Sequence, residues 1–105
     1  MRQQKGMQRV SVTREDHSAI IAIHGDFVFD VNREFREAYQ QLPQRTRITV
    51  DLSRTHYMDS AGLGMLIQLR EHVGKDAADI RLTGINETLR TILNVANFGR
   101  LFKIE

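Results

Sequence analysis

Short apolar strands alternate with amphipathic helical segments along this chain of 105 residues, and their order restricts the fold more than any other feature. Two strands, Val10–Thr13 and Ala19–His24, are separated by a short polar turn, which predicts a β-hairpin. Further strands are predicted at residues 48–52, 79–83 and 101–104, with helical spacing of apolar residues at 31–42, 63–73 and 89–96. Strand–helix–strand units normally give parallel neighbours. The order therefore predicts an α/β fold: one domain with a mixed sheet of about five strands flanked by about three helices.

Local signals mark where the helices begin and end. Asp30 and Asn86 are candidate N-caps, and Pro43 stops the first helix. The chain is long enough for one hydrophobic core and too short for two. Residues 1–8 are polar and are predicted to be a flexible tail, which leaves 9–105 as the domain. The predicted core comes from the strands, namely Ile20, Ile21, Ile23, Ile48, Val50, Leu52, Ile80 and Leu82.

Composition argues against several classes of function. The chain has no cysteine, and its net charge of +2 comes from scattered basic residues without the stripe expected of a nucleic-acid-binding protein. No apolar run approaches the ~20 residues of a membrane span, and the N-terminus lacks the apolar segment of a signal peptide. No pair of histidines has metal-ligand spacing, so we predict neither a metal site nor a cofactor.

The run Met58–Gly64 (MDSAGLG) lies between an apolar strand and a helical pattern, which places it at a strand-to-helix turn. The first backbone N–H groups of a helix lack internal partners, and the helix dipole is positive there. The hydroxyl of Ser60 is therefore well placed to receive, hold or recognise a phosphate. Gly62 and Gly64 leave the backbone uncovered, so that another protein can approach closely.

Each of these residues also has a purely structural interpretation. Serine is favoured at helix N-caps. Asp59 is either a favourable charge at the helix start or a group that orients the hydroxyl or binds the metal ion of a kinase that modifies it. The two glycines also suit close packing of the helix on the sheet. The helix carries more apolar residues than one buried face needs, so Leu63 and Met65 either face a partner or fill a second packing layer. A nucleophilic serine is not expected, because Met58 stands where Gly-x-Ser-x-Gly requires glycine.

Three segments in register resemble the STAS domain, and specifically the stand-alone anti-sigma factor antagonists. They are residues 50–53 followed by 58–64, residues 23–27 (IHGDF) and residues 98–104 (FGRLFKI). The resemblance covers essentially the whole chain. Its most specific part is the Asp-Ser-small-Gly-Leu-Gly element between a strand and a helix.

The resemblance implies a regulatory protein without enzymatic activity or catalytic residues. In that family the unphosphorylated protein captures an anti-sigma factor, which is also a serine kinase of the GHKL type, and so frees a sigma factor or another regulator. Phosphorylation releases the kinase, and a metal-dependent serine phosphatase reverses the modification. Ser60 matches the phosphorylated serine and Asp59 the acidic position before it. The predicted partner-binding residues are Asp26, Asp59, Ser60, Ala61, Gly62, Leu63, Gly64 and Met65.

One position departs from the family pattern, and two other functions stay open. Val28 stands where family members often carry an acidic residue, with Asp26 and Asp30 on either side. STAS domains also resemble accessory subunits of ABC-type lipid transporters, in which the serine turn docks on a permease. The family name suggests nucleotide binding as well, although the chain has no Gly-x-x-x-x-Gly-Lys loop. We expect a cytoplasmic protein that is monomeric when free.

Overall fold

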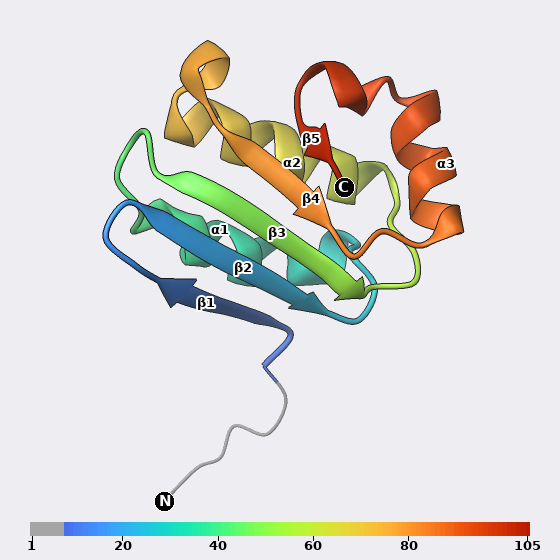
Figure 1. Cartoon of the computed structure of the whole chain (residues 1–105). Coiled ribbons are helices and arrows are strands. Elements are labelled where there is room, and N and C mark those ends of the chain that lie inside the picture. Colours follow the sequence, from blue (N-terminus) through green and yellow to red (C-terminus); the bar gives the residue numbers. More distant parts are fainter. Residues whose placement is uncertain (1–7) are drawn as a thin grey trace, which may run out of the picture.

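The computed structural model describes residues 8–105, and the tail predicted at residues 1–8 lies, apart from Gln8, outside the described residues. The described chain forms one α/β domain with a mixed sheet, as the sequence predicts (Figure 1). Its strands are β1 (Val10–Arg14), β2 (Ser18–His24), β3 (Arg47–Arg54), β4 (Ile80–Thr83) and β5 (Lys103–Ile104). Its α-helices are α1 (Asn32–Gln40), α2 (Ser60–Val73) and α3 (Glu87–Val95), and single 3-10 turns are η1 (Phe29–Val31), η2 (Lys75–Ala77) and η3 (Phe98–Arg100).

The strands lie in the sheet in the order in which they occur along the chain. β1 and β2 form the predicted antiparallel hairpin, whereas β2, β3, β4 and β5 are parallel neighbours. One α-helix makes each parallel connection. Each of these connections leads to the next strand in the same direction across the sheet. Right-handed crossovers of this kind place their helices on the same face of the sheet. Figure 1 shows α1 and α2 together behind the sheet, so the domain has two layers.

The face of the sheet that points away from α1 and α2 carries mostly polar side chains. One row crosses all five strands, from Thr13 through Ile20, Thr49 and Arg81 to Lys103. Ile20 is 46% exposed, so its predicted place in the core is wrong, whereas the other seven predicted core residues are buried. The cause is the two-residue period of a strand, which turns Ile20 away from the helices when its neighbours in sequence turn toward them.

The predicted starts of α1 and α2 differ from the structure, whereas the predicted N-cap of α3 is confirmed. Asp30 does not cap α1, because it lies inside η1, and Val31 occupies the N-cap position without a side-chain hydrogen bond. Helix α2 begins at Ser60, three residues earlier than the predicted start. Asn86 caps α3 as predicted, and its Oδ1 accepts the N–H of Leu89 at 2.8 Å.

The hydrophobic core fills the space between the sheet and the helices. Aromatic side chains from the β2–α1 connection and α1 pack edge to face, with ring centroids 4.9 Å apart for Phe27 and Phe35 and 5.5 Å apart for Phe35 and Tyr39. Helices α2 and α3 contribute fully buried leucines and a valine: Leu66, Leu69, Val73, Leu89 and Leu93. Within residues 8–105 no helix has the length and hydrophobicity to cross a membrane.

Candidate functional site

Ser60 is the first residue of α2, and its side chain is exposed. The residue before it, Asp59, has an extended backbone and is the N-cap, with its Oδ1 accepting the N–H of Gly62 at 3.0 Å. The capping role considered for Ser60 therefore belongs to Asp59. The Ser60 hydroxyl stands at the positive end of a 14-residue helix, where its position suits a negatively charged group.

Two loops that follow neighbouring parallel strands run side by side beneath this serine. The N–H of Gly25 donates to the carbonyl of Arg54 at 3.1 Å, and that of Phe27 donates to the carbonyl of Tyr57 at 2.9 Å. Phe27 and Met58 form a parallel bridge, and both side chains are buried. The backbone pairing of β2 and β3 thus continues past the strands, and it holds the segment containing Asp26 beside the start of α2.

The two glycines of α2 serve different purposes. A Cβ on Gly62 would collide with the backbone carbonyl oxygen of Phe27 and would lie 3.2 Å from Cβ of Met58. Gly62 is therefore required for α2 to pack on the loop beneath it. A Cβ on Gly64 would have nothing within 4 Å, and Gly64 is exposed. Gly64 leaves bare helix backbone on the outer surface, one turn after Ser60.

The eight predicted partner-binding residues differ in how far they are exposed to solvent. Asp26, Ser60 and Gly64 are exposed; Asp59, Ala61 and Leu63 are partly exposed; Gly62 and Met65 are buried. Met65 is only 3% exposed and belongs to the core, so the prediction that its side chain contacts a partner is wrong. A second packing layer is the correct interpretation for Met65, because the tight approach of α2 at Gly62 brings the next turn of the helix down onto the sheet as well.

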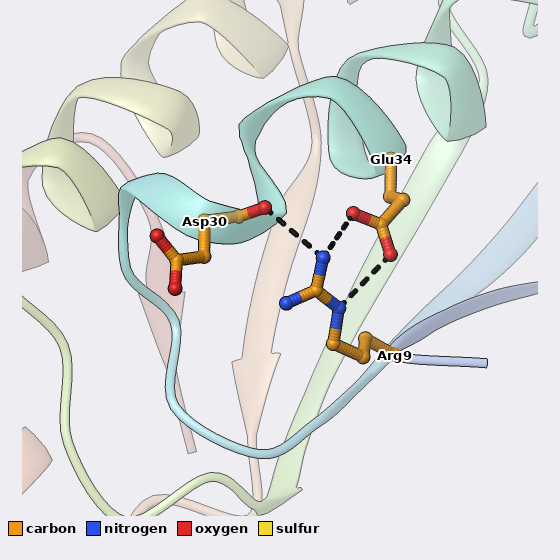
Figure 2. Close-up of polar contacts among 3 residues, drawn as sticks. All are labelled: Arg9, Asp30 and Glu34. Carbon is orange, nitrogen blue, oxygen red and sulfur yellow. Dashed lines mark hydrogen bonds and ion pairs between the residues drawn. The ribbon is translucent and has the colours of Figure 1, made fainter. Parts of the chain in front are cut away.

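Arg9, which immediately precedes β1, holds the connection between β2 and α1 in place. Its guanidinium donates to both carboxylate oxygens of Glu34, at 2.7 and 3.1 Å, and to the backbone carbonyl of Asp30 at 3.2 Å (Figure 2). A two-point contact of this kind holds an arginine in one orientation. The partners are 21 and 25 residues away from Arg9 in sequence, so no local pattern could have revealed them.

The loop that precedes α2 is braced by two side chains, Thr55 and Asn86, whose contacts with this loop the sequence did not reveal. The buried Thr55 donates its hydroxyl to the carbonyl of Ile23 at 3.3 Å. Asn86, the N-cap of α3, donates its amide to the carbonyls of Thr55 and His56, each at 3.4 Å. The start of α3 and the end of β2 therefore both hold the loop that presents Ser60.

Two exposed aromatic side chains, one in each of the segments that lead into α1 and α2, were also missed. Phe29 in η1 is 67% exposed, and Tyr57 in the loop before α2 is 47% exposed. The available signal was an aromatic residue outside any apolar period, next to aspartates and a turn, which is unusual for a core residue. Within residues 8–105 no group of three or more histidine, cysteine or acidic side chains is arranged to hold a metal ion.

One carboxylate at the same end of the sheet has a shifted pKa. The backbone N–H of Ser53 donates to Asp51 Oδ1 at 3.0 Å. This bond and a second one from the Ser53 hydroxyl lower the pKa of Asp51, with a smaller contribution from His24 and Arg54. Hydrogen bonds to the ionised form favour that form, so Asp51 stays charged to lower pH than an ordinary aspartate.

Comparison with known proteins assigns this two-layer α/β domain to a family. A family model described as "Mlab, STAS domain" matches residues 10–103. A STAS-domain containing protein of Pseudomonas aeruginosa (strain UCBPP-PA14) is 42% identical over 85 residues, which are 80% of this chain and 84% of that protein. The chain belongs to the STAS-domain family.

Solved structures share the fold at low sequence identity. A Thermotoga maritima protein, provisionally described as an anti-sigma factor antagonist, superposes with a TM-score of 0.79 at 18% identity, covering 90% of this chain and 84% of that one. The anti-sigma factor antagonist SpoIIAA in its unphosphorylated form gives 0.69 at 16% identity, covering 91% and 86%. The phosphorylated form of SpoIIAA from Bacillus gives 0.63 at 16% identity, covering 91% and 90%.

Proposed function

We propose that this protein is an anti-sigma factor antagonist that works as a phosphorylation-controlled partner switch in the cytoplasm. In its unphosphorylated form it binds an anti-sigma factor of the serine-kinase type, which frees a sigma factor or another regulator. Phosphorylation of Ser60 ends the contact, and a metal-dependent phosphatase restores it. The shared fold of SpoIIAA, which has been solved with and without phosphate, supports this proposal.

The observation that carries the proposal is the exposed glycine one turn after the exposed serine. Glycine inside a helix costs about 1 kcal/mol relative to alanine. At Gly62 the cost is offset by packing against Phe27, but Gly64 has open space around it. A residue that weakens its own helix without improving the packing of the domain is expected at a functional surface. A partner that approaches the bare backbone at Gly64 covers Ser60 as well.

The proposed switch acts locally. A phosphate on Ser60 adds about −1.5 to −2 charges at pH 7 beside Asp59. The helix dipole offsets this charge by about 0.3–1 kcal/mol at an exposed site, so the domain stays folded. A partner surface that closes over Ser60 must strip water from the phosphate, which opposes binding. A loss of about 3–4 kcal/mol at the interface weakens binding on the order of several hundredfold.

Affinity purification from native lysate, with mapping of the phosphorylated residue, tests the proposal. We expect Ser60→Ala to retain a serine kinase and Ser60→Asp to lose it, while phosphate is found on Ser60 of the native protein. Thr91→Asp, at an exposed position in α3, is the matched control for an added negative charge. Equal recovery of the kinase with Ser60→Ala and Ser60→Asp would contradict the proposal.

The same purification also tests the alternative function, that of an accessory subunit of a transporter. That role needs docking but no kinase. It predicts that Ser60 is unmodified in the cell and that the protein is recovered with membrane transporter subunits. Titration with GTP and ATP decides the nucleotide-binding alternative.

A further inference from the structure

Strand β1 forms one edge of the sheet, and its only strand neighbour among residues 8–105 is β2 (Figure 1). The carbonyl of Arg9 accepts an N–H of β2 at 2.8 Å, and the N–H of Glu15 donates to a carbonyl of β2 at 2.9 Å. In an antiparallel ladder, every second residue bonds to a given neighbour. The odd-numbered residues of this segment therefore bond to β2, whereas the N–H and C=O groups of Val10, Val12 and Arg14 point away from the sheet.

This edge lacks the features by which native sheets commonly prevent the addition of another strand. Such edges are very short, or carry proline, a bulge or an inward-pointing charge. The opposite edge fits this description, because β5 has only two residues. Strand β1 has five residues, pairs with β2 without a shift of register, and carries no charge before Arg14. Val12 packs against the core and is still partly exposed, so a strand added here would complete its burial.

A hollow between β1 and α1 lies along the open edge and contains charges of both signs. Its charged residues are Arg9, Arg14, Glu34 and Glu37. Arg9 is engaged by Glu34 at 2.7 Å. Arg14 and Glu37 are both exposed, and neither forms an ion pair with any residue from 8 to 105. The hollow therefore offers one cation and one anion that have no charged partner in the described part of the chain.

These two charges stand at different places along the strand. Helix α1 connects the parallel strands β2 and β3, so it runs opposite to them and in the same direction as β1. Glu34 lies beside the start of β1, where it contacts Arg9, and Glu37 follows about one turn later. This half of the hollow thus contains two carboxylates and one guanidinium, whereas Arg14 is the last residue of the strand. A second hollow, around the start of α1, contains the other basic residues of this helix, Arg33 and Arg36.

A second copy of β1 matches this edge in one antiparallel register. Outward-pointing groups pair only with one another, and all three such residues pair only when Val12 lies opposite its own equivalent. Arg14 then lies opposite the second copy's Val10, beside the half of the hollow that contains two glutamates. The twofold axis repeats this contact on the other side. Just outside the ladder, position 9 comes opposite position 15, and these positions carry arginine and glutamate, so no like charges meet.

We propose that the open edge of β1 is a dimerisation surface, which pairs with the same strand of a second copy to form one continuous sheet. Ladder hydrogen bonds join the two strands, and Arg14 pairs with the second copy's Glu37 on both sides of the twofold axis. The free protein is then a dimer, in contrast to the monomer expected from the sequence. This inference does not depend on the proposed function, since it needs neither a kinase nor a phosphate.

Analytical ultracentrifugation of the purified full chain, over a hundredfold range of concentration, measures the Kd of the dimer. Arg14→Glu and Glu37→Arg each bring like charges together twice, and each should raise Kd at least tenfold. The double variant restores opposite charges, and its Kd should lie within threefold of the wild type. Arg90→Glu, at an exposed position in α3, is the matched control for charge reversal and should leave Kd within twofold.

Amide hydrogen exchange followed by NMR locates the contact. The N–H of Val12 should gain protection as the protein concentration rises, whereas the N–H of Thr13, which donates to β2, should be protected at every concentration. A monomer over the whole concentration range would overturn the proposal. A dimer that tolerates both charge reversals, or that leaves the exchange of Val12 unchanged, would place the interface elsewhere and overturn it equally. A double variant as weak as the single ones would overturn the pairing of Arg14 with Glu37.

Discussion

The backbone carbonyl of Phe27 occupies the space in which Gly62 would carry a side chain. This contact sets the distance between α2 and the loop that follows β2. It also fixes the position of Ser60, two residues before Gly62, relative to the acidic segment that contains Asp26. The exposed serine is therefore presented by a close-packed junction of two loops and a helix.

Gly62→Ala should destabilise the domain. The added methyl group meets backbone atoms that cannot move aside, so α2 must shift, and overpacking of this kind costs about 1–3 kcal/mol. Urea unfolding followed by circular dichroism measures the change in the free energy of unfolding. A variant as stable as the wild type would show that α2 and the loop containing Phe27 can move apart at little cost in free energy.

Gly64→Ala should have the opposite effect on stability and should weaken partner binding. The new methyl group has no neighbour within 4 Å, and replacing glycine by alanine inside a helix stabilises it by about 0.5–1 kcal/mol. The same methyl group obstructs a partner that approaches the helix backbone. Urea unfolding and co-purification with the kinase give the two measurements. Increased stability with undiminished binding would remove the main support for a docking surface at Gly64.

Much of the fold could be predicted because its signals are local. The strand periods, the stop at Pro43 and the cap at Asn86 each need only a few neighbouring residues. The β1–β2 hairpin could be predicted because only a short turn separates its two strands. Ile20 was misplaced because an apolar run hides the two-residue period that decides which face a side chain joins.

The site was predicted less completely because its construction is not local. The serine turn was identified, but which residue caps α2 depends on where the chain enters the helix, and Asp59 and Ser60 are both suitable types. The burial of Met65 and the need for glycine at position 62 depend on Phe27, more than 30 residues earlier. The Arg9 contact with Asp30 and the exposure of Phe29 likewise exist only after the sheet has formed.

Asp59→Ala should lower stability by about 1 kcal/mol, because the N–H of Gly62 loses its acceptor. Asp59→Asn should retain most of the stability, since asparagine caps helices about as well as aspartate. Thermal unfolding of the two variants separates the hydrogen bond from the charge. Equal losses in both would mean that the charge of Asp59, rather than its hydrogen bond, stabilises the start of α2.

Ser60→Asp should leave the free energy of unfolding within about 0.5 kcal/mol of the wild type, because an exposed substitution away from packed groups has a small effect. The favourable helix dipole and the repulsion from Asp59 act in opposite directions on the new carboxylate. Urea unfolding checks this expectation at low and high salt. A loss of several kcal/mol would mean that the variant loses its partner by unfolding, so that loss of binding could not be taken as evidence of a local switch.

Asp51→Asn should reduce stability at neutral pH, and the difference from the wild type should shrink as the solution becomes acidic. The hydrogen bonds from Ser53 place the pKa of Asp51 in the folded state below that of the unfolded chain, which is about 3.9. The folded state therefore binds fewer protons than the unfolded state over that interval, and stability rises with pH there. The contribution is complete above the unfolded pKa and is lost as the pH falls through the folded pKa. Because Asp51 is partly accessible to solvent, the effect is small, and urea unfolding of both proteins at pH 7, 5, 4 and 3 resolves it best as a trend. A difference that stayed constant below pH 4 would show that the variant acts through something other than the ionisation of this carboxylate.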